Sequence, residues 1–205
     1  MDAEENASDS VPFSALDRFI HGSAADPDER ELVRGAQRGD RACFAALYDR
    51  YYRRVYAYAF YRADGDPAAA EDVTQEVFLR AFRAIGRFAW RDASFLAWLL
   101  TIARNLLVDR ARRPQPLPLD GREDDLTADP IAAAEGRLTR REVAAALARL
   151  TADQREAIIL RFLDGLSIAE TSRIMGKTED AVKRLQARGL AALRRHLGVG
   201  EPREG

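Results

Sequence analysis

The chain has 205 residues, a length that fits one large domain or two small ones, and its 32 basic and 33 acidic side chains nearly cancel. One cysteine, Cys43, and two histidines exclude an intramolecular disulfide and a Cys/His zinc site. The apolar runs fall far short of the roughly 18 residues of a membrane span, and the acidic start MDAEENASDS lacks the pattern of a secretory signal. We therefore expect a cytoplasmic protein with no stable membrane insertion.

Charge is distributed along the chain in four segments of alternating sign. Residues 1–27 hold six acidic and one basic side chain, and residues 28–113 hold twelve acidic and sixteen basic ones. Residues 114–135 again hold six acidic and one basic, and residues 136–205 hold nine acidic and fourteen basic. Two basic blocks separated by an acidic segment indicate two modules that face a polyanion.

The acidic segment between the two basic blocks predicts a domain boundary. Its prolines cannot continue a helix, and its run Glu123-Asp124-Asp125 has too little apolar surface to pack. The predicted units are an acidic and largely disordered arm at 1–27, a helical domain at 28–113, a linker at 114–134, a second helical domain at 135–197 and a tail at 198–205. Within the arm, only residues 12–20 show an amphipathic helical pattern.

Both basic blocks show the helical period, because apolar residues recur every three or four positions and no window alternates with period two. The predicted fold class is all-α. Asp26, Asp66 and Asp129 each precede a proline and mark helix starts. Helices are expected near 27–38, 41–62, 67–85 and 94–112 in the first block, and near 130–149, 152–163, 168–175 and 179–196 in the second.

In the first block, the aromatic residues of the helix at 41–62 follow the helical period and are expected to form a core. The next helix should bury Val73, Val77, Phe78, Ala81, Phe82 and Ile85. It turns an acidic stripe outward that consists of Glu71, Asp72, Gln75, Glu76 and Arg80. Such a stripe would repel DNA, so it is either solvated surface or a docking face for a basic protein partner.

The loop at 86–93 places two aromatic residues, Phe88 and Trp90, beside Arg87 and Arg91. Aromatic rings interleaved with arginines suit the stacking of unpaired bases, although Trp90 could instead cap the helical bundle. The helix that follows has an apolar face and a polar one. Its polar face carries Arg104, Asn105, Asp109, Arg110, Arg112 and Arg113.

The second block contains the pattern of a helix-turn-helix. Thr151 with Gln154 and Ser167 with Glu170 form capping boxes, and residues 175–178 provide a short turn before the last helix. Thr178 starts that helix, whose outer face carries Lys183, Arg184, Gln186 and Arg188. These side chains suit phosphate contacts and the reading of base edges in a major groove, the alternative being a merely solvated basic face.

The residues resemble a known family, the extracytoplasmic function (ECF, group IV) sigma factors of bacterial RNA polymerase, within the sigma-70 family. The matching stretches are Asp72 to Leu79 (DVTQEVFL), Phe95 to Trp98 (FLAW), Ile102 to Asn105 (IARN), Asp109 to Arg113 (DRARR) and Leu150 to Glu156 (LTADQRE), which leads into the helix-turn-helix. They occur in the family's order over about residues 28–197.

The resemblance implies a σ2-like helical bundle that opens the −10 element and a σ4-like helix-turn-helix domain that reads the −35 element, joined by an extended acidic linker. It implies −35 contacts from Thr178, Lys183, Arg184, Gln186 and Arg188. It implies −10 contacts from Phe88, Trp90, Arg91, Arg104, Asn105, Arg112 and Arg113, with a flipped base held by the loop. It implies polymerase contacts from Asp72, Gln75, Glu76, Phe78 and Leu79.

The partners implied by the resemblance are core RNA polymerase, through its β′ clamp helices and β flap, promoter DNA and an anti-sigma factor. We expect a non-enzymatic specificity subunit without a cofactor, because no nucleophile–base set, phosphate loop or metal cluster is evident. One alternative is a stand-alone two-domain helix-turn-helix regulator. Another is a helical adaptor that binds only proteins, although it leaves the basic face of the last helix unexplained.

Overall fold

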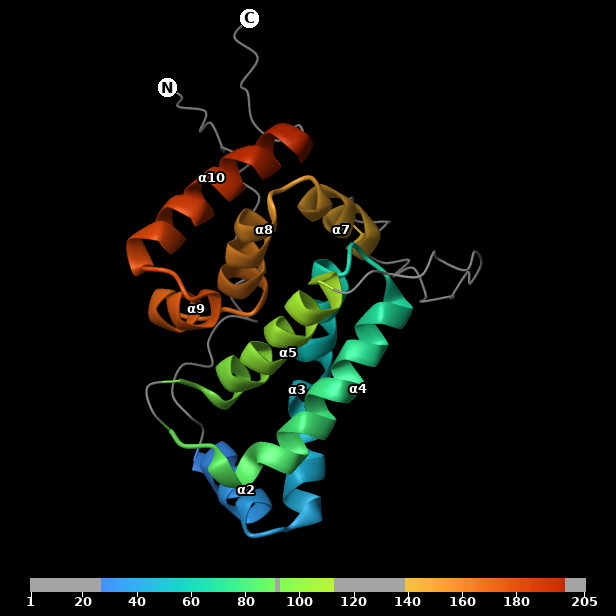
Figure 1. The fold of residues 1–205 in the computed structure, drawn as a ribbon, viewed down its shortest axis with the longest axis vertical. Coiled ribbons are helices and arrows are strands. Elements are labelled where there is room, and N and C mark those ends of the chain that lie inside the picture. The colour runs from blue at the N-terminus through green and yellow to red at the C-terminus, as the bar shows by residue number, and fades with distance from the viewer. Residues whose placement is uncertain (1–26, 91–92, 113–138, 198–205) are drawn as a thin grey trace, which may run out of the picture.

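The structure is a computed structural model that describes residues 27–90, 93–112 and 139–197. Within these ranges every regular element is a helix, which confirms the predicted all-α class. Predictions for the acidic arm, Arg91, Arg113, the linker and the tail lie outside the described residues. Figure 1 shows two groups of helices stacked along the long axis of the molecule.

The N-terminal domain contains four α-helices: α2 (Pro27–Gln37), α3 (Arg41–Arg62), α4 (Pro67–Ala84) and α5 (Phe95–Arg112). A 3-10 turn, η1 (Ile85–Arg87), continues α4. Asp66 accepts hydrogen bonds from the amides of Ala68 and Ala69 at 2.9 and 3.1 Å, and Pro67 occupies the first turn, so this predicted helix start is confirmed. Asp40 starts α3 in the same way.

The C-terminal domain contains α7 (Arg140–Ala148), α8 (Ala152–Ile158), α9 (Ile168–Met175) and α10 (Glu179–Leu197). The predicted helix at 152–163 is present, but its last five residues form a π-helical turn, η2 (Ile159–Leu163). Both predicted capping boxes are confirmed at Thr151 and Ser167, and Thr139 with Glu142 adds a third. Of the helix predicted at 130–149, only the portion from residue 139 is described, and in it the helix runs from Arg140 to Ala148.

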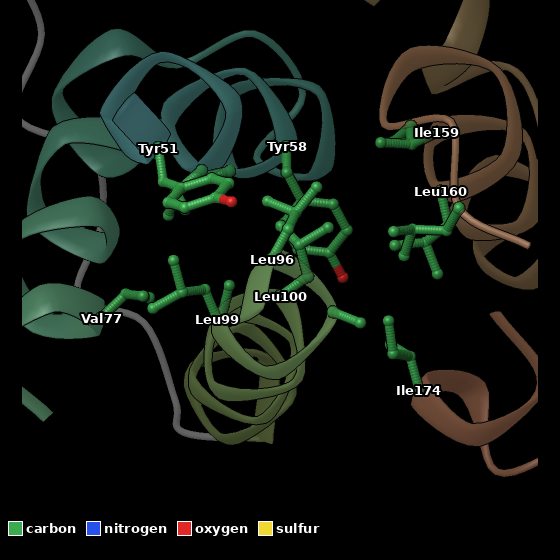
Figure 2. Packing of buried hydrophobic residues seen from close by; sticks show 14 of the residues in the cluster. Tyr51, Tyr58, Val77, Leu96, Leu99, Leu100, Ile159, Leu160 and Ile174 are labelled. Atoms are coloured by element: carbon green, nitrogen blue, oxygen red, sulfur yellow. The ribbon is translucent and has the colours of Figure 1, made fainter. Parts of the chain in front are cut away.

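One hydrophobic core extends through both domains. Figure 2 shows side chains of α3 and α5 close to those of η2 and α9. Tyr58, Leu100, Ile159 and Leu160 are fully buried where the two groups of helices meet. The two domains therefore share buried apolar surface, a feature that the separate helical patterns did not predict.

The prediction that Phe82 is buried is wrong, because its side chain is 49% exposed. Its ring makes an edge-on contact with Phe44 of α3 at 4.9 Å between centroids, but the described helices leave about half of the side chain uncovered. Among the described helices, none combines the length and apolarity that a membrane crossing requires.

Candidate nucleic-acid interface

The helix-turn-helix is formed by α9 and α10, and its turn is fixed by local hydrogen bonds. Gly176 ends α9 with a left-handed backbone, φ 63°, which favours glycine. The Ser172 hydroxyl donates to the carbonyl of Lys177 at 2.7 Å, and the Lys177 amide donates to the carbonyl of Ser172 at 3.0 Å. The Thr178 hydroxyl then accepts from the Ala181 amide at 3.2 Å and starts α10.

The inner face of α10 packs closely on α8. Val182 and Ala192 are buried, and Gly189 lies so near α8 that an added Cβ would be 2.9 Å from Cγ1 of Ile158. A glycine at this position therefore permits the close approach of the two helices. The orientation of the outer face of α10 is thus set by direct contact with α8.

The outer face of α10 is basic and exposed. Thr178, Lys183, Arg184 and Arg188 are all exposed, so four of the five residues predicted to bind DNA in this domain are accessible. Gln186 differs from them, because it is half-buried and accepts a hydrogen bond from Nε of Arg161 at 3.3 Å. In this structure Gln186 therefore serves to position α10 against η2.

The loop from Gly86 to Trp90 is fixed by contacts with two helices. The side-chain amide of Gln37 donates to the carbonyls of Ile85 and Phe88 at 3.2 and 2.7 Å. Phe88 is buried, and its ring lies 5.1 Å from that of Trp98. Trp90 is only partly buried, and the guanidinium of Arg30 lies 5.5 Å from its ring centroid. Phe88 thus supports the loop while Trp90 keeps an accessible surface.

A groove of about 460 Å³ lies beside this loop, between the two domains. Phe88 and Trp98 of the N-terminal domain line one side, and Arg173 and Ile174 of α9 line the other. Glu170 spans the two domains, because one of its oxygens accepts from the Ser94 hydroxyl at 2.7 Å and the other from that of Ser167 at 2.8 Å. Burial by itself would raise the pKa of Glu170, but the hydrogen bonds from these two serines lower it.

On the polar face of α5, some residues are exposed and others contact the C-terminal domain. Asn105 and Arg112 are exposed, as their predicted DNA contact requires. Arg104 instead lies 3.1 Å through Nε from Oε1 of Glu156, and its Nη2 is 3.5 Å from the carbonyl of Met175. This predicted DNA-binding residue therefore faces the C-terminal domain in the structure.

The acidic stripe on α4 is accessible in the structure. Asp72 and Gln75 are exposed, and Asp72 is 3.8 Å from Nη2 of Arg110. Glu76 is half-buried and pairs with Arg80 at 2.6 Å. Phe78 is buried in the core, whereas Leu79 is 43% exposed.

Phe82 lies three residues beyond Leu79 on α4, so these two exposed apolar side chains extend the stripe by one helical turn. Sequence reasoning missed the exposure of Phe82, because the helical period alone assigned it to the core.

No group of His, Cys, Asp or Glu side chains that could hold a metal ion occurs among the described residues.

Comparison with known proteins identifies the family to which both domains are related. Residues 47–115 match Sigma-70 region 2, and residues 140–193 match Sigma-70 region 4. The chain is 43% identical over 187 residues to the ECF RNA polymerase sigma factor BldN of Streptomyces coelicolor, covering 85% of this chain and 69% of that protein. The chain belongs to the ECF sigma factors of RNA polymerase.

A second curated relative names the same family, and a solved structure is similar in fold. The ECF sigma factor SigX of Bacillus subtilis is 37% identical over 165 residues, covering 75% of this chain and 83% of that protein. The solved structure of CnrH in complex with the cytosolic domain of CnrY aligns with a TM-score of 0.62 and 27% identity, over 85% of this chain and 99% of that chain. As an ECF sigma factor, the protein is non-enzymatic and directs transcription initiation by RNA polymerase.

Proposed function

We propose that this sigma factor reads the −35 element through the outer face of α10 and opens the −10 element with the Gly86–Trp90 loop and the polar face of α5. The observation that carries the proposal is the capped helix-turn-helix, which presents Lys183, Arg184 and Arg188 to solvent on one face of α10. Exposed arginine and lysine at the start of a recognition helix suit phosphate contacts and the edges of guanine.

Transcription from reconstituted components tests whether the two domains bind the two promoter elements as proposed. Core polymerase with this factor should initiate at a defined set of promoters, whose common sequences would reveal both elements. A stand-alone helix-turn-helix regulator or a helical adaptor would not confer initiation. Initiation that depends on only one conserved element would contradict the two-element proposal.

The loop supplies a partly accessible ring for an unpaired base. We expect Trp90→Ala to impair promoter opening while it leaves duplex binding unchanged, because stacking on an extruded base contributes about 1 to 3 kcal/mol only after the strands separate. Permanganate reactivity of unpaired thymines measures opening directly. Trp90→Phe is the matched control, since it retains a stacking surface and should restore most of the opening. Normal opening by Trp90→Ala would show that Trp90 only covers the bundle.

The stripe on α4 is the proposed docking face for core polymerase, with the β′ clamp helices as its partner. Asp72 and Glu76 are separated by one helical turn and carry the acidic charge, while Leu79 and Phe82 add apolar contact area. The β flap is the corresponding partner proposed for the C-terminal domain.

Reversing both charges, with Asp72→Lys and Glu76→Lys, should weaken association with core polymerase by at least about tenfold, because like charges would then face a basic surface. The helical circular-dichroism signal should not change, since both side chains lie outside the core. Glu31→Lys with Asp49→Lys provides a control with the same change in charge at exposed positions on α2 and α3, outside the stripe. Equal affinity of the two double variants would mean that only net charge matters.

We also propose a protein partner of the anti-sigma class and a cytoplasmic location. The supporting observation for the partner is that CnrH, which is similar to this chain, was solved in complex with the cytosolic domain of CnrY. Co-purification of the tagged factor with a protein that blocks its transcription activity would test this part of the proposal.

A further inference from the structure

The two domains are in direct contact, and their closest approaches involve three pairs of elements. Helix α5 lies against α9, and α3 lies against both η2 and α7. Figure 2 shows the side chains of the two domains that approach one another, which include Tyr58, Leu96, Leu100, Ile159, Leu160 and Ile174. All six are buried. The structure is therefore a closed form in which the promoter-binding domains cover part of each other.

A buried carboxylate lies within this contact. Glu156 on α8 is only 3% exposed, and its side-chain partners among the described residues come from the N-terminal domain. Its Oε1 accepts a hydrogen bond from the Tyr58 hydroxyl at 3.0 Å and lies 3.1 Å from Nε of Arg104. Its Oε2 lies 3.7 Å from Nη2 of Arg62. One acidic side chain thus links α8 to both α3 and α5.

Three further polar contacts surround this central group. The guanidinium of Arg54 donates to the backbone carbonyl of Asp164. Arg155 pairs with Asp64 at 2.5 Å, and Glu170 accepts hydrogen bonds from Ser94. Each contact joins one domain to the other, so separation of the domains would break all of them together.

The chemistry of this interface suits a reversible contact better than a permanent one. Burying charged groups carries a large desolvation cost, and apolar residues of similar volume often stabilise a contact more. In the closed form, Nε of Arg62 and Oδ2 of Asp164 are buried without a hydrogen-bond partner among the described residues, and Nε of Arg104 has an ion pair with Glu156 but no hydrogen bond of good geometry. These groups would regain hydration when the domains separate. That hydration offsets part of the free energy lost when the interdomain contacts break.

The closed form is also too small to contact both promoter elements. A compact body of this length has a radius of gyration of about 17 Å and so measures roughly 43 Å across. Two elements separated by two helical turns of DNA lie about 70 Å apart. Residues 113–138 connect the domains and could span at most about 90 Å, so the chain length permits separation.

We propose that Glu156 holds the free sigma factor in a closed, promoter-incompetent form through Tyr58, Arg62 and Arg104, and that binding to core polymerase and promoter DNA breaks this interdomain latch. The inference rests on the proposed function, because it takes Arg104 and the Gly86–Trp90 loop as DNA-binding surface. In the closed form Arg104 is engaged by Glu156, and α9 forms one wall of the groove beside the loop.

The distance between the domains in the free protein tests the latch. Spin labels at Arg83→Cys and Ala187→Cys, in a Cys43→Ser background, report this distance from two exposed positions outside the contact. We expect one short distance for the otherwise unchanged protein. Glu156→Gln should raise the population of long distances at least about tenfold, because it leaves two partly buried arginines without their counter-ion.

Asp153→Asn is the matched control for Glu156→Gln. Asp153 lies on the same helix, but its partner is Lys177 of its own domain, at 3.0 Å. This variant should keep the short distance. Arg62→Met removes a partner of Glu156 in the N-terminal domain and should open the protein as Glu156→Gln does. Because two variants test the same contact, the result does not depend on the folding of one of them. Circular dichroism should show unchanged helicity in all three.

Short distances in both Glu156→Gln and Arg62→Met would overturn the latch, and so would equal opening by Asp153→Asn. A second readout is transcription by the reconstituted holoenzyme. Glu156→Gln should retain promoter activity once bound to core polymerase, because the latch has no role in the open form, and a loss of activity would contradict the proposal. The distance measurement uses no DNA, so it decides the latch independently of the residues assigned to promoter contacts.

Discussion

Arg184→Ala is expected to weaken promoter binding by about 1 to 3 kcal/mol, or roughly 5- to 150-fold, if its guanidinium reads a base edge. Arg188 lies one helical turn further along the exposed face of α10, so the double alanine variant should lose still more. Holoenzyme affinity for promoter variants, measured at several salt concentrations, distinguishes the two kinds of contact. A base contact would relax selectivity at one position, whereas a phosphate contact would weaken all sequences alike and reduce the salt slope.

The control for this experiment is Arg141→Ala, which removes an exposed arginine from α7 in the same domain. It changes the net charge by the same amount as Arg184→Ala but lies outside the helix-turn-helix. Unchanged affinity in the Arg184 and Arg188 double variant would remove both residues from the DNA-binding surface. Equal losses in the Arg141 and Arg184 variants would mean that the domain contributes only unspecific charge.

A second large effect is expected from pH, through Asp164. This side chain is 3% exposed, and its Oδ1 lies 3.9 Å from Nε of Arg54. Burial raises the pKa of Asp164 from 3.8 to about 7, and Arg54 opposes part of the rise. The folded protein therefore binds a proton at Asp164 at pH values where the unfolded chain does not. Stability from this group should be greatest at low pH and should fall as pH rises from about 4 to about 7.

The size of the effect follows from about 1.4 kcal/mol per pKa unit, which gives on the order of 4 kcal/mol for the rise from 3.8 to about 7. Urea denaturation between pH 5.5 and pH 8 isolates it, because the carboxyls of Asp40, Glu142 and Glu170 have lowered pKa values and remain ionised there. Asp164→Asn should remove the pH dependence, and the exposed Asp153→Asn should preserve it. A denaturation midpoint that does not fall toward pH 8 would contradict the assignment.

The features that could be predicted from the sequence are those with local causes. The capping boxes at Thr151 and Ser167 and the Asp66–Pro67 start depend on side chains within three residues of the amides that they satisfy. The same signal is present at Thr139 with Glu142, and it was available to sequence analysis although it was not used. The exposed arginines of α10 were also predictable, since the helical period separates them from Val182 and Ala192.

The features that could not be predicted depend on how separate elements meet. The burial of Phe82 was wrongly expected because helical period does not reveal where a neighbouring helix stops covering α4. The engagement of Arg104 requires Glu156, and that of Gln186 requires Arg161, each from a distant part of the chain. A single sequence gives no register between such partners. The contact between the two domains therefore depends on pairings across the fold that the sequence does not reveal.

The close approach at Gly189 has a consequence for how the factor moves. Helix α8 contacts α10 through Ile158 on one side and reaches the N-terminal domain through Glu156 on the other. The C-terminal domain should therefore swing as one rigid body when the domains separate, with the recognition helix carried along in fixed orientation. In hydrogen-exchange measurements, amides within α8 and α10 would keep their protection during this motion, while faster exchange would be confined to amides covered by the partner domain. Motions of this type occur on the microsecond to millisecond scale. Because α8 and α10 move together, the −35 reading surface would stay preformed throughout the motion.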